Sequence, residues 1–91
     1  MEKDKRYKTV KLLIENGHIT VLSQIFEYVP VSKVASDLGT NYNRLKRLVE
    51  HVDQFVVRDL YTLGNFLEIE RKKILELMDA QYDVDRNNHR K

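Results

Sequence analysis

The centre of the chain brings together five side chains of kinds that bind nucleic acid: Tyr42, Asn43, Arg44, Lys46 and Arg47. Arginine, lysine and asparagine donate hydrogen bonds to base edges and to phosphate oxygens in the major groove of DNA. A plainer interpretation stays open, because most neighbouring Lys and Arg residues belong to a solvated helix face, and Tyr42 can pack against the preceding helix. Arg44 precedes an apolar position, so a phosphate contact suits it better than a base contact.

Two more polar residues complete the predicted contact set. Asn41 stands at the expected start of a helix, where its side-chain oxygen can accept hydrogen bonds from the unpaired amides of the first turn. Capping is therefore the first expectation for Asn41, with a phosphate contact as the alternative. Lys33, on the preceding predicted helix, is a further basic contact. A basic cluster near the N-terminus predicts either an arm along a DNA groove or a merely solvated end: Lys3, Lys5, Arg6 and Lys8.

Residue types that would indicate other chemistry are missing or scattered. The chain has no cysteine, which excludes disulfides, thiolate nucleophiles and zinc–cysteine sites. Its histidines, His18, His51 and His89, lack the i, i+4 spacing of a helical metal site. No glycine-rich phosphate loop, nucleophile elbow or carboxylate pair can be assembled. We therefore expect no enzymatic activity, no metal and no cofactor, and no small-molecule site is evident.

Charge is distributed unevenly along the 91 residues. The net charge is only +2, and the 33% of charged residues is above the usual value, as in a folded domain with a charged surface. Basic residues outnumber acidic ones by five to two in residues 1–11 and by four to two in residues 31–50, whereas acidic residues prevail by four to one in residues 51–70. Such polarity is expected when one face of a protein meets phosphate.

No apolar run approaches the roughly 20 residues that cross a bilayer. The N-terminus leads into no uninterrupted apolar stretch of the signal-peptide type. We therefore expect a soluble protein, and the absence of cysteine suits the reducing cytoplasm.

Helices are expected to position these side chains, because apolar residues recur at spacings of three and four and no segment alternates as a strand does. Asn16 and Gly17 end the first helix, and Thr20 caps the second. Phe55 anchors an irregular connection, and Gly64 implies that another helix approaches closely. Residues 83–91 are polar and predict a flexible tail. The expected helices cover residues 4–16, 20–29, 31–38, 42–51, 60–67 and 70–82.

The apolar and glycine positions of residues 31–50 have a spacing with a physical rationale. Ala35 is small enough for two helices to cross closely, Gly39 can adopt the left-handed conformation of a tight turn, and two leucines seat the second helix on a core. With this spacing the segment resembles the helix-turn-helix of the λ-repressor-like family, also called Cro-type or XRE. The match rests on Val34, Ala35, Leu38, Gly39, Leu45 and Leu48, and the wider resemblance covers residues 19–78. The chain departs from the family pattern at Thr40, Val49, Gly64 and the connection 52–56.

The resemblance implies an all-α fold, a compact bundle of five to six short helices with a central helix-turn-helix. It implies one DNA-binding domain over residues 1–82, with residues 1–17 as an added N-terminal helix. The implied function is sequence-specific binding of duplex DNA as a transcriptional regulator, with Tyr42–Glu50 in the major groove of paired half-sites and the protein as a homodimer. The alternative is a protein-interaction module on the same fold, an antitoxin-like or adaptor subunit, without DNA activity of its own.

Overall fold

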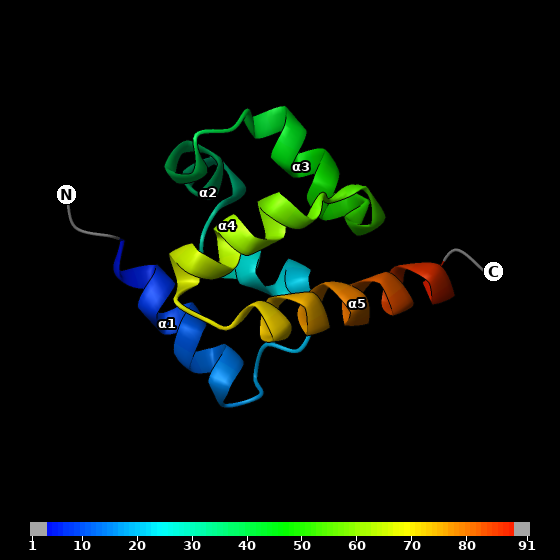
Figure 1. The fold of residues 1–91 in the computed structure, drawn as a ribbon, viewed down its shortest axis with the longest axis horizontal. Helices are drawn as coiled ribbons and strands as arrows, with labels where there is room; N and C mark the ends of the chain where they lie inside the picture. The colour runs from blue at the N-terminus through cyan, green and yellow to red at the C-terminus, as the bar shows by residue number, and fades with distance from the viewer. Residues whose placement is uncertain (1–3, 89–91) are drawn as a thin grey trace.

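Helices form all the regular secondary structure in residues 4–88, the part of the chain that the computed structural model describes (Figure 1). The predicted all-helical bundle is therefore confirmed. Within that range no helix combines the length and the apolar character needed to cross a membrane. Five α-helices and two short 3-10 helices follow one another as α1 (Lys5–Glu15), η1 (Leu22–Glu27), α2 (Val31–Leu38), α3 (Tyr42–Glu50), η2 (Val52–Gln54), α4 (Val57–Leu67) and α5 (Arg71–Asn88).

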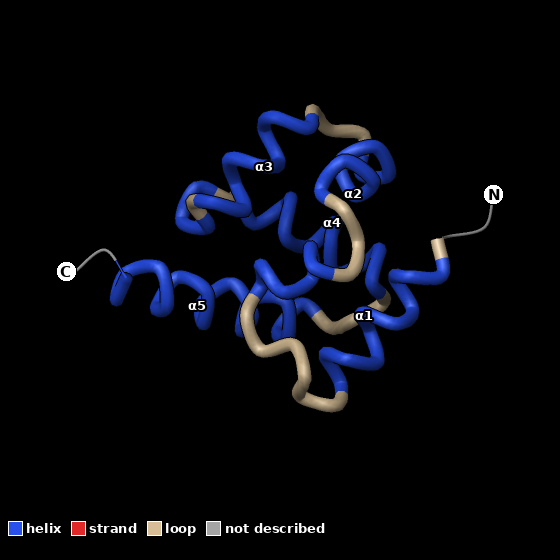
Figure 2. The backbone as a smooth tube through the Cα atoms, turned by 180° about the vertical axis from the view of Figure 1, so that it is seen from behind, coloured by secondary structure: helices blue, strands red, loops and turns tan. Residues whose placement is uncertain are grey.

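Helix α4 runs through the middle of the molecule, with α2 and α3 on one side of it and α1 and α5 on the other (Figures 1 and 2). Its apolar face supplies Leu60, Leu63 and Leu67, each 1% exposed. Burial of such apolar surface is the main favourable contribution to folding. The other helices and the segments between them supply the remaining buried apolar residues: Tyr7, Val10, Ile14, Ile19, Leu22, Ile25, Val29, Val34, Ala35, Leu45, Leu48, Val52, Ile74 and Leu77.

The N-terminal helix α1 begins and ends where the sequence predicts. Asp4 caps it by accepting a hydrogen bond from the amide of Arg6 at 2.9 Å, and Gly17 after its end has the left-handed φ of 80°. Tyr7, which is 3% exposed, packs against Phe66 of α4 with ring centroids 5.1 Å apart. The added helix to which the family resemblance assigns no role is thus part of the core.

The second helical segment differs from its prediction. In place of a helix over residues 20–29, the chain forms the 3-10 helix η1, and its N-cap residue is Val21 rather than Thr20. Gln24 Oε1 accepts hydrogen bonds from the amides of Thr20 at 2.7 Å and Val21 at 3.2 Å, just before η1 begins. A capping hydroxyl at Thr20 would serve the amide of Leu22 or Ser23, and the amide of Ser23 donates instead to Gln81 Oε1 at 3.0 Å.

Helix α5 continues to Asn88, past the predicted end at residue 82. Residues 83–88 are therefore helical where a flexible tail was predicted, and the rest of that tail lies outside the described residues. Gln81, which is 6% exposed, supports the added turns. Its Nε2 donates to Asp85 Oδ1 at 2.8 Å, and its Oε1 accepts a hydrogen bond from the amide of Ser23 at 3.0 Å. Gln81, which is bonded to η1, thus supports a part of α5 that has no apolar stripe and that the sequence therefore did not predict as helix.

Gly64 lies in the middle of α4, where α5 approaches. A Cβ atom added at Gly64 would lie 3.4 Å from Cγ2 of Ile74 and 3.6 Å from the carbonyl oxygen of Ile69. The predicted close approach is therefore present, at distances that a methyl group can still occupy.

Candidate nucleic-acid interface

Helices α2 and α3 are joined by a tight left-handed turn. Gly39 after α2 has φ of 71° and ψ of 30°, a conformation that suits glycine. The amide of Gly39 donates to the carbonyl of Ser36 at 3.2 Å, and the amide of Thr40 donates to that of Ala35 at 2.9 Å. These bonds satisfy the last carbonyls of α2 and turn the chain toward α3. The turn therefore fixes where α3 begins.

Asn41 caps α3, as predicted. Its Oδ1 accepts hydrogen bonds from the amides of Asn43 at 2.8 Å and Arg44 at 3.2 Å. These amides belong to the first turn and have no carbonyl partner within the helix. The Asn41 carboxamide oxygen is therefore occupied by the helix.

Helix α3 has one buried face and one exposed polar face. Leu45 and Leu48, 2% and 5% exposed, attach it to the core. Tyr42 is 46% exposed, so its ring lies at the surface and is not buried against α2. The other exposed polar side chains of this face are Asn43, Lys46, Arg47 and Glu50. Four of the predicted contact residues thus lie together at the surface.

Arg44 has two partners inside the molecule. Its Nη2 donates to Asp59 Oδ2 of α4 at 2.6 Å, and its Nη1 donates to Thr40 Oγ1 at 3.2 Å. The two charged side chains remain partly exposed, at 40% for Arg44 and 24% for Asp59. The phosphate contact predicted for Arg44 therefore competes with a carboxylate 15 residues away in the sequence.

Lys33 is likewise engaged, where α1 meets α2. Its Nζ donates to Asp37 Oδ1 at 3.1 Å, and Asp37 Oδ2 accepts a hydrogen bond from the Tyr7 hydroxyl at 2.6 Å. The bonds from Tyr7 and Lys33 lower the pKa of the Asp37 carboxyl. Burial, with the bond to Asp37, raises the pKa of Tyr7. Lys33 thus belongs to a three-residue network, although 39% of its side chain is exposed.

A hollow of about 400 Å³ lies between α3 and α4. Arg58, an exposed residue in the first turn of α4, lines it together with Arg44 and Asp59. Sequence reasoning missed Arg58 because it is the one basic residue in the acidic stretch 51–70. The side chains that form the apolar part of the hollow are Leu38, Leu45, Leu48, Phe55 and Leu63.

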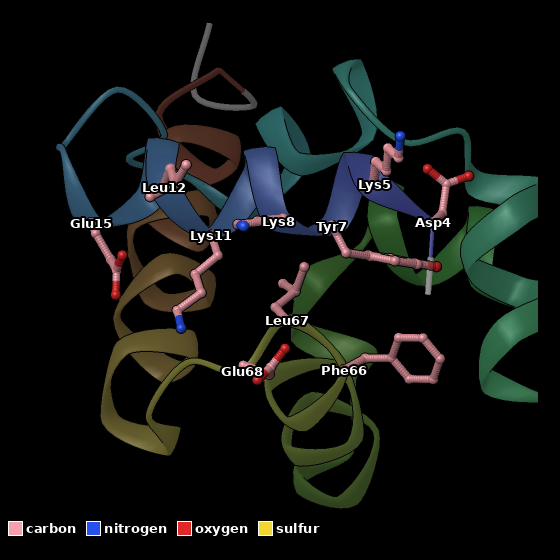
Figure 3. A pocket seen from close by; sticks show the side chains of 10 residues that line it. All are labelled: Asp4, Lys5, Tyr7, Lys8, Lys11, Leu12, Glu15, Phe66, Leu67 and Glu68. Carbon is pink, nitrogen blue, oxygen red and sulfur yellow. The ribbon is translucent and has the colours of Figure 1, made fainter. Parts of the chain in front are cut away.

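A second hollow, of about 470 Å³, separates α1 from the end of α4 (Figure 3). Both signs of charge line it, three ammonium groups and three carboxylates: Lys5, Lys8, Lys11, Asp4, Glu15 and Glu68.

The basic N-terminal cluster therefore lies among carboxylates. Arg6 is paired with Asp4 at 2.6 Å, which lowers the pKa of that carboxyl. Lys5 and Lys8 line the hollow of mixed charge, and Lys3 lies outside the described residues. Within residues 4–88, this end of α1 offers phosphate no surface of a single sign.

No protein-family model matches the chain, and neither a curated protein nor a solved structure matches it. The family resemblance of residues 31–50 therefore stays a prediction.

Proposed function

We propose that the chain binds duplex DNA through α3, as a sequence-specific transcriptional regulator of the cytoplasm in which α2, the turn and α3 act as a helix-turn-helix. The observation that carries the proposal is the exposed polar face of α3, opposite a face that Leu45 and Leu48 fix in the core. A helix held in this way can enter a major groove about 12 Å wide, where its polar side chains meet base edges and phosphates.

Lys46 and Arg47 are the central residues of the proposal. Within residues 4–88 neither makes an ion pair, so DNA displaces no internal carboxylate from them. Arg47 lies in the last turn of α3, where a cation also offsets the partial negative charge of the helix end. Lys46 has no such second role, so its replacement is the sharper test.

A homodimer suits so short a recognition helix. α3 has nine residues and reaches few base pairs, so two copies on half-sites about one helical turn apart raise both affinity and specificity. Light scattering coupled to gel filtration measures the mass, and selection from a random duplex library reports the half-site symmetry. A monomer that selects an unsymmetrical site would overturn this part of the proposal.

Fluorescence anisotropy with a labelled random duplex pool tests DNA binding. If the protein makes two to four phosphate contacts, its DNA affinity should fall by on the order of 10- to 100-fold when the salt concentration rises from 50 to 200 mM, because counterions are released on binding. We expect Lys46→Ala and Arg47→Ala each to weaken binding by roughly tenfold, in the range of one lost base or phosphate contact. Absence of binding to any duplex pool at low salt would overturn the proposal.

The matched control is the double variant Lys72→Ala/Arg86→Ala. Both residues are exposed and basic, and both lie on α5. The control removes as much charge as Lys46→Ala/Arg47→Ala. If it weakens DNA binding equally, the effect belongs to net charge and α3 is not the site.

The alternative function, a protein-interaction module without DNA activity, is favoured by one observation. Val56 and Val57, at the start of α4, are adjacent apolar residues that are 48% and 55% exposed. Adjacent exposed apolar side chains are typical of interaction surfaces when they form part of a larger patch. This function predicts a stoichiometric protein complex that Val56→Ser/Val57→Ser weakens and Lys46→Ala/Arg47→Ala leaves intact. Duplex binding that depends on Lys46 would count against it.

A further inference from the structure

The hollow between α3 and α4 has the composition of a small-ligand site. Its apolar lining comes from α2, from α3, from α4 and from the connection between η2 and α4. Three of the lining residues, Leu45, Leu48 and Leu63, are at most 5% exposed, so the core holds them in place. Its volume of about 400 Å³ falls within the usual range of small-molecule pockets. Such pockets typically combine an apolar wall with a few polar groups that orient the ligand.

The charged groups of this hollow favour an anion. Arg44 and Arg58 line it beside a single carboxylate, Asp59, and that carboxylate is already paired with Arg44 at 2.6 Å. Arg58 makes no ion pair within residues 4–88. Its guanidinium is therefore the uncompensated charge at the hollow, and a guanidinium can bind a carboxylate through two parallel hydrogen bonds.

We propose that this hollow binds a small amphipathic carboxylate. The apolar body of the ligand lies against Leu45, Leu48 and Leu63, and its carboxylate accepts hydrogen bonds from Arg58. A small molecule suits the site, because residues of the turn after α2, of α3 and of α4 line a volume of about 400 Å³. The ligand carboxylate also competes with Asp59 for Arg44.

Occupancy of the hollow changes the link between two helices, since Arg44 belongs to α3 and Asp59 to α4. If α3 contacts DNA, ligand binding and DNA binding are coupled, and the coupling is equal in both directions. This second step rests on the function proposed above. Ligand binding itself does not depend on it.

A ¹H–¹⁵N NMR titration of the whole chain with 4-phenylbutyrate, without DNA, tests the site. We expect saturable shifts of the backbone amides in residues 38–48 and 58–63. The neutral analogue 4-phenylbutyramide should bind about tenfold more weakly, because it forms no charge-assisted hydrogen bonds. Acetate, which lacks the apolar body, should give no saturable shift. Shifts scattered over the whole surface, or equal affinities for any two of these probes, would overturn the proposal.

Three variants separate binding from structure. Arg58→Gln changes an exposed side chain and should weaken 4-phenylbutyrate binding by about tenfold. Asp59→Asn should strengthen 4-phenylbutyrate binding several-fold, because it removes the repulsion between two carboxylates at a partly exposed site. A role of Asp59 in structure alone does not predict this gain. Arg86→Gln on α5 is the matched control and should leave the affinity unchanged. Unaltered affinity in Arg58→Gln overturns the site.

The coupling to DNA is measured separately, by anisotropy at saturating 4-phenylbutyrate. A changed DNA affinity supports the second step, and an unchanged one overturns it. If the protein binds no DNA, the function proposed above is wrong, but the NMR titration still tests the ligand site. The two failures are therefore distinguishable.

Discussion

Nη2 of Arg44 in α3 lies 2.6 Å from Oδ2 of Asp59 in α4. A second bond from the same guanidinium, to the hydroxyl of Thr40, reaches the turn that precedes α3. One side chain of the exposed helix thus joins the turn, α3 and α4. The orientation of α3 against the bundle consequently depends on a partly exposed ion pair as well as on leucines in the core.

The contribution of this pair to stability should be small and dependent on salt. We expect Arg44→Gln and Asp59→Asn each to lower the free energy of unfolding by about 1 kcal/mol or less, because solvent screens a pair exposed to 40% and 24%. Urea denaturation of both variants and of the double variant gives the coupling energy, expected at about 0.2–1 kcal/mol and smaller in high salt. A coupling that does not change with salt would contradict an electrostatic origin.

Replacement of Gly39 tests the turn between α2 and α3. Gly39→Ala should lower the free energy of unfolding by about 1–2 kcal/mol, because an L-residue with a side chain is strained at φ of 71°. Apart from the neighbouring residues of the chain, no atom lies within 4 Å of the added Cβ, so no steric clash adds to the backbone strain. Gly39→Asn is the control and should lose less, since asparagine tolerates this conformation. Equal unfolding midpoints of Gly39→Ala and the parent chain would contradict the predicted strain at this position.

Gly64 should respond in the opposite direction. Gly64→Ala is expected to raise the free energy of unfolding by roughly 0.5–1 kcal/mol, because alanine is the better helix former. The new methyl group meets Ile74 at 3.4 Å, an ordinary contact distance. Gly64→Val adds bulk against the same side chain and should destabilise the protein. Thermal and urea denaturation measure both, and a loss of more than about 1 kcal/mol in Gly64→Ala would mean that α5 cannot accommodate a methyl group.

The Tyr7 hydroxyl predicts a specific dependence of stability on pH. Its pKa is raised in the folded state above the ordinary 10.0, so the neutral hydroxyl contributes stability that is complete below pH 10 and is lost as the pH rises through the folded value. Tyr7→Phe should cost about 0.5–1.5 kcal/mol near neutral pH through the lost hydrogen bond to Asp37.

The same variant should lose stability less steeply than the parent chain above pH 10, because it has no hydroxyl to ionise. Urea unfolding at a series of pH values measures both slopes. Tyr28→Phe, at a tyrosine that is 43% exposed, controls for the loss of a hydroxyl. Parallel slopes for Tyr7→Phe and the parent chain would contradict the prediction.

Apolar spacing was enough to predict most of the helices. The stripe that contains Leu45 and Leu48 predicts α3, and the one that contains Leu60, Leu63 and Leu67 predicts α4, because these residues bury a single helix face. The end of α5 was not predicted, because residues 83–88 carry no such apolar stripe. Gln81 supports them through a bond to a residue 58 positions away.

The candidate site was predictable to a similar degree. Local capping rules placed Asn41 correctly, and the exposed side chains of α3 follow from the positions of its buried leucines. The partners of Arg44 and Lys33 were not predictable, since Asp59 and Tyr7 come from other helices. Arg58 was overlooked because charge counted along a segment does not show which hollow a single side chain lines.

The bond between the Gln81 carboxamide and the amide of Ser23 bears on how the protein is made. Ser23 leaves the ribosome 58 residues before Gln81, so its amide meets its acceptor only after the whole segment between them has been synthesised. Contacts between residues so far apart in sequence form late and slowly, after shorter loops have closed. A nascent chain that stops just before Gln81 contains α3 complete, yet it lacks the acceptor for the Ser23 amide of η1. The position of η1 therefore becomes final only after Gln81 of α5 has emerged.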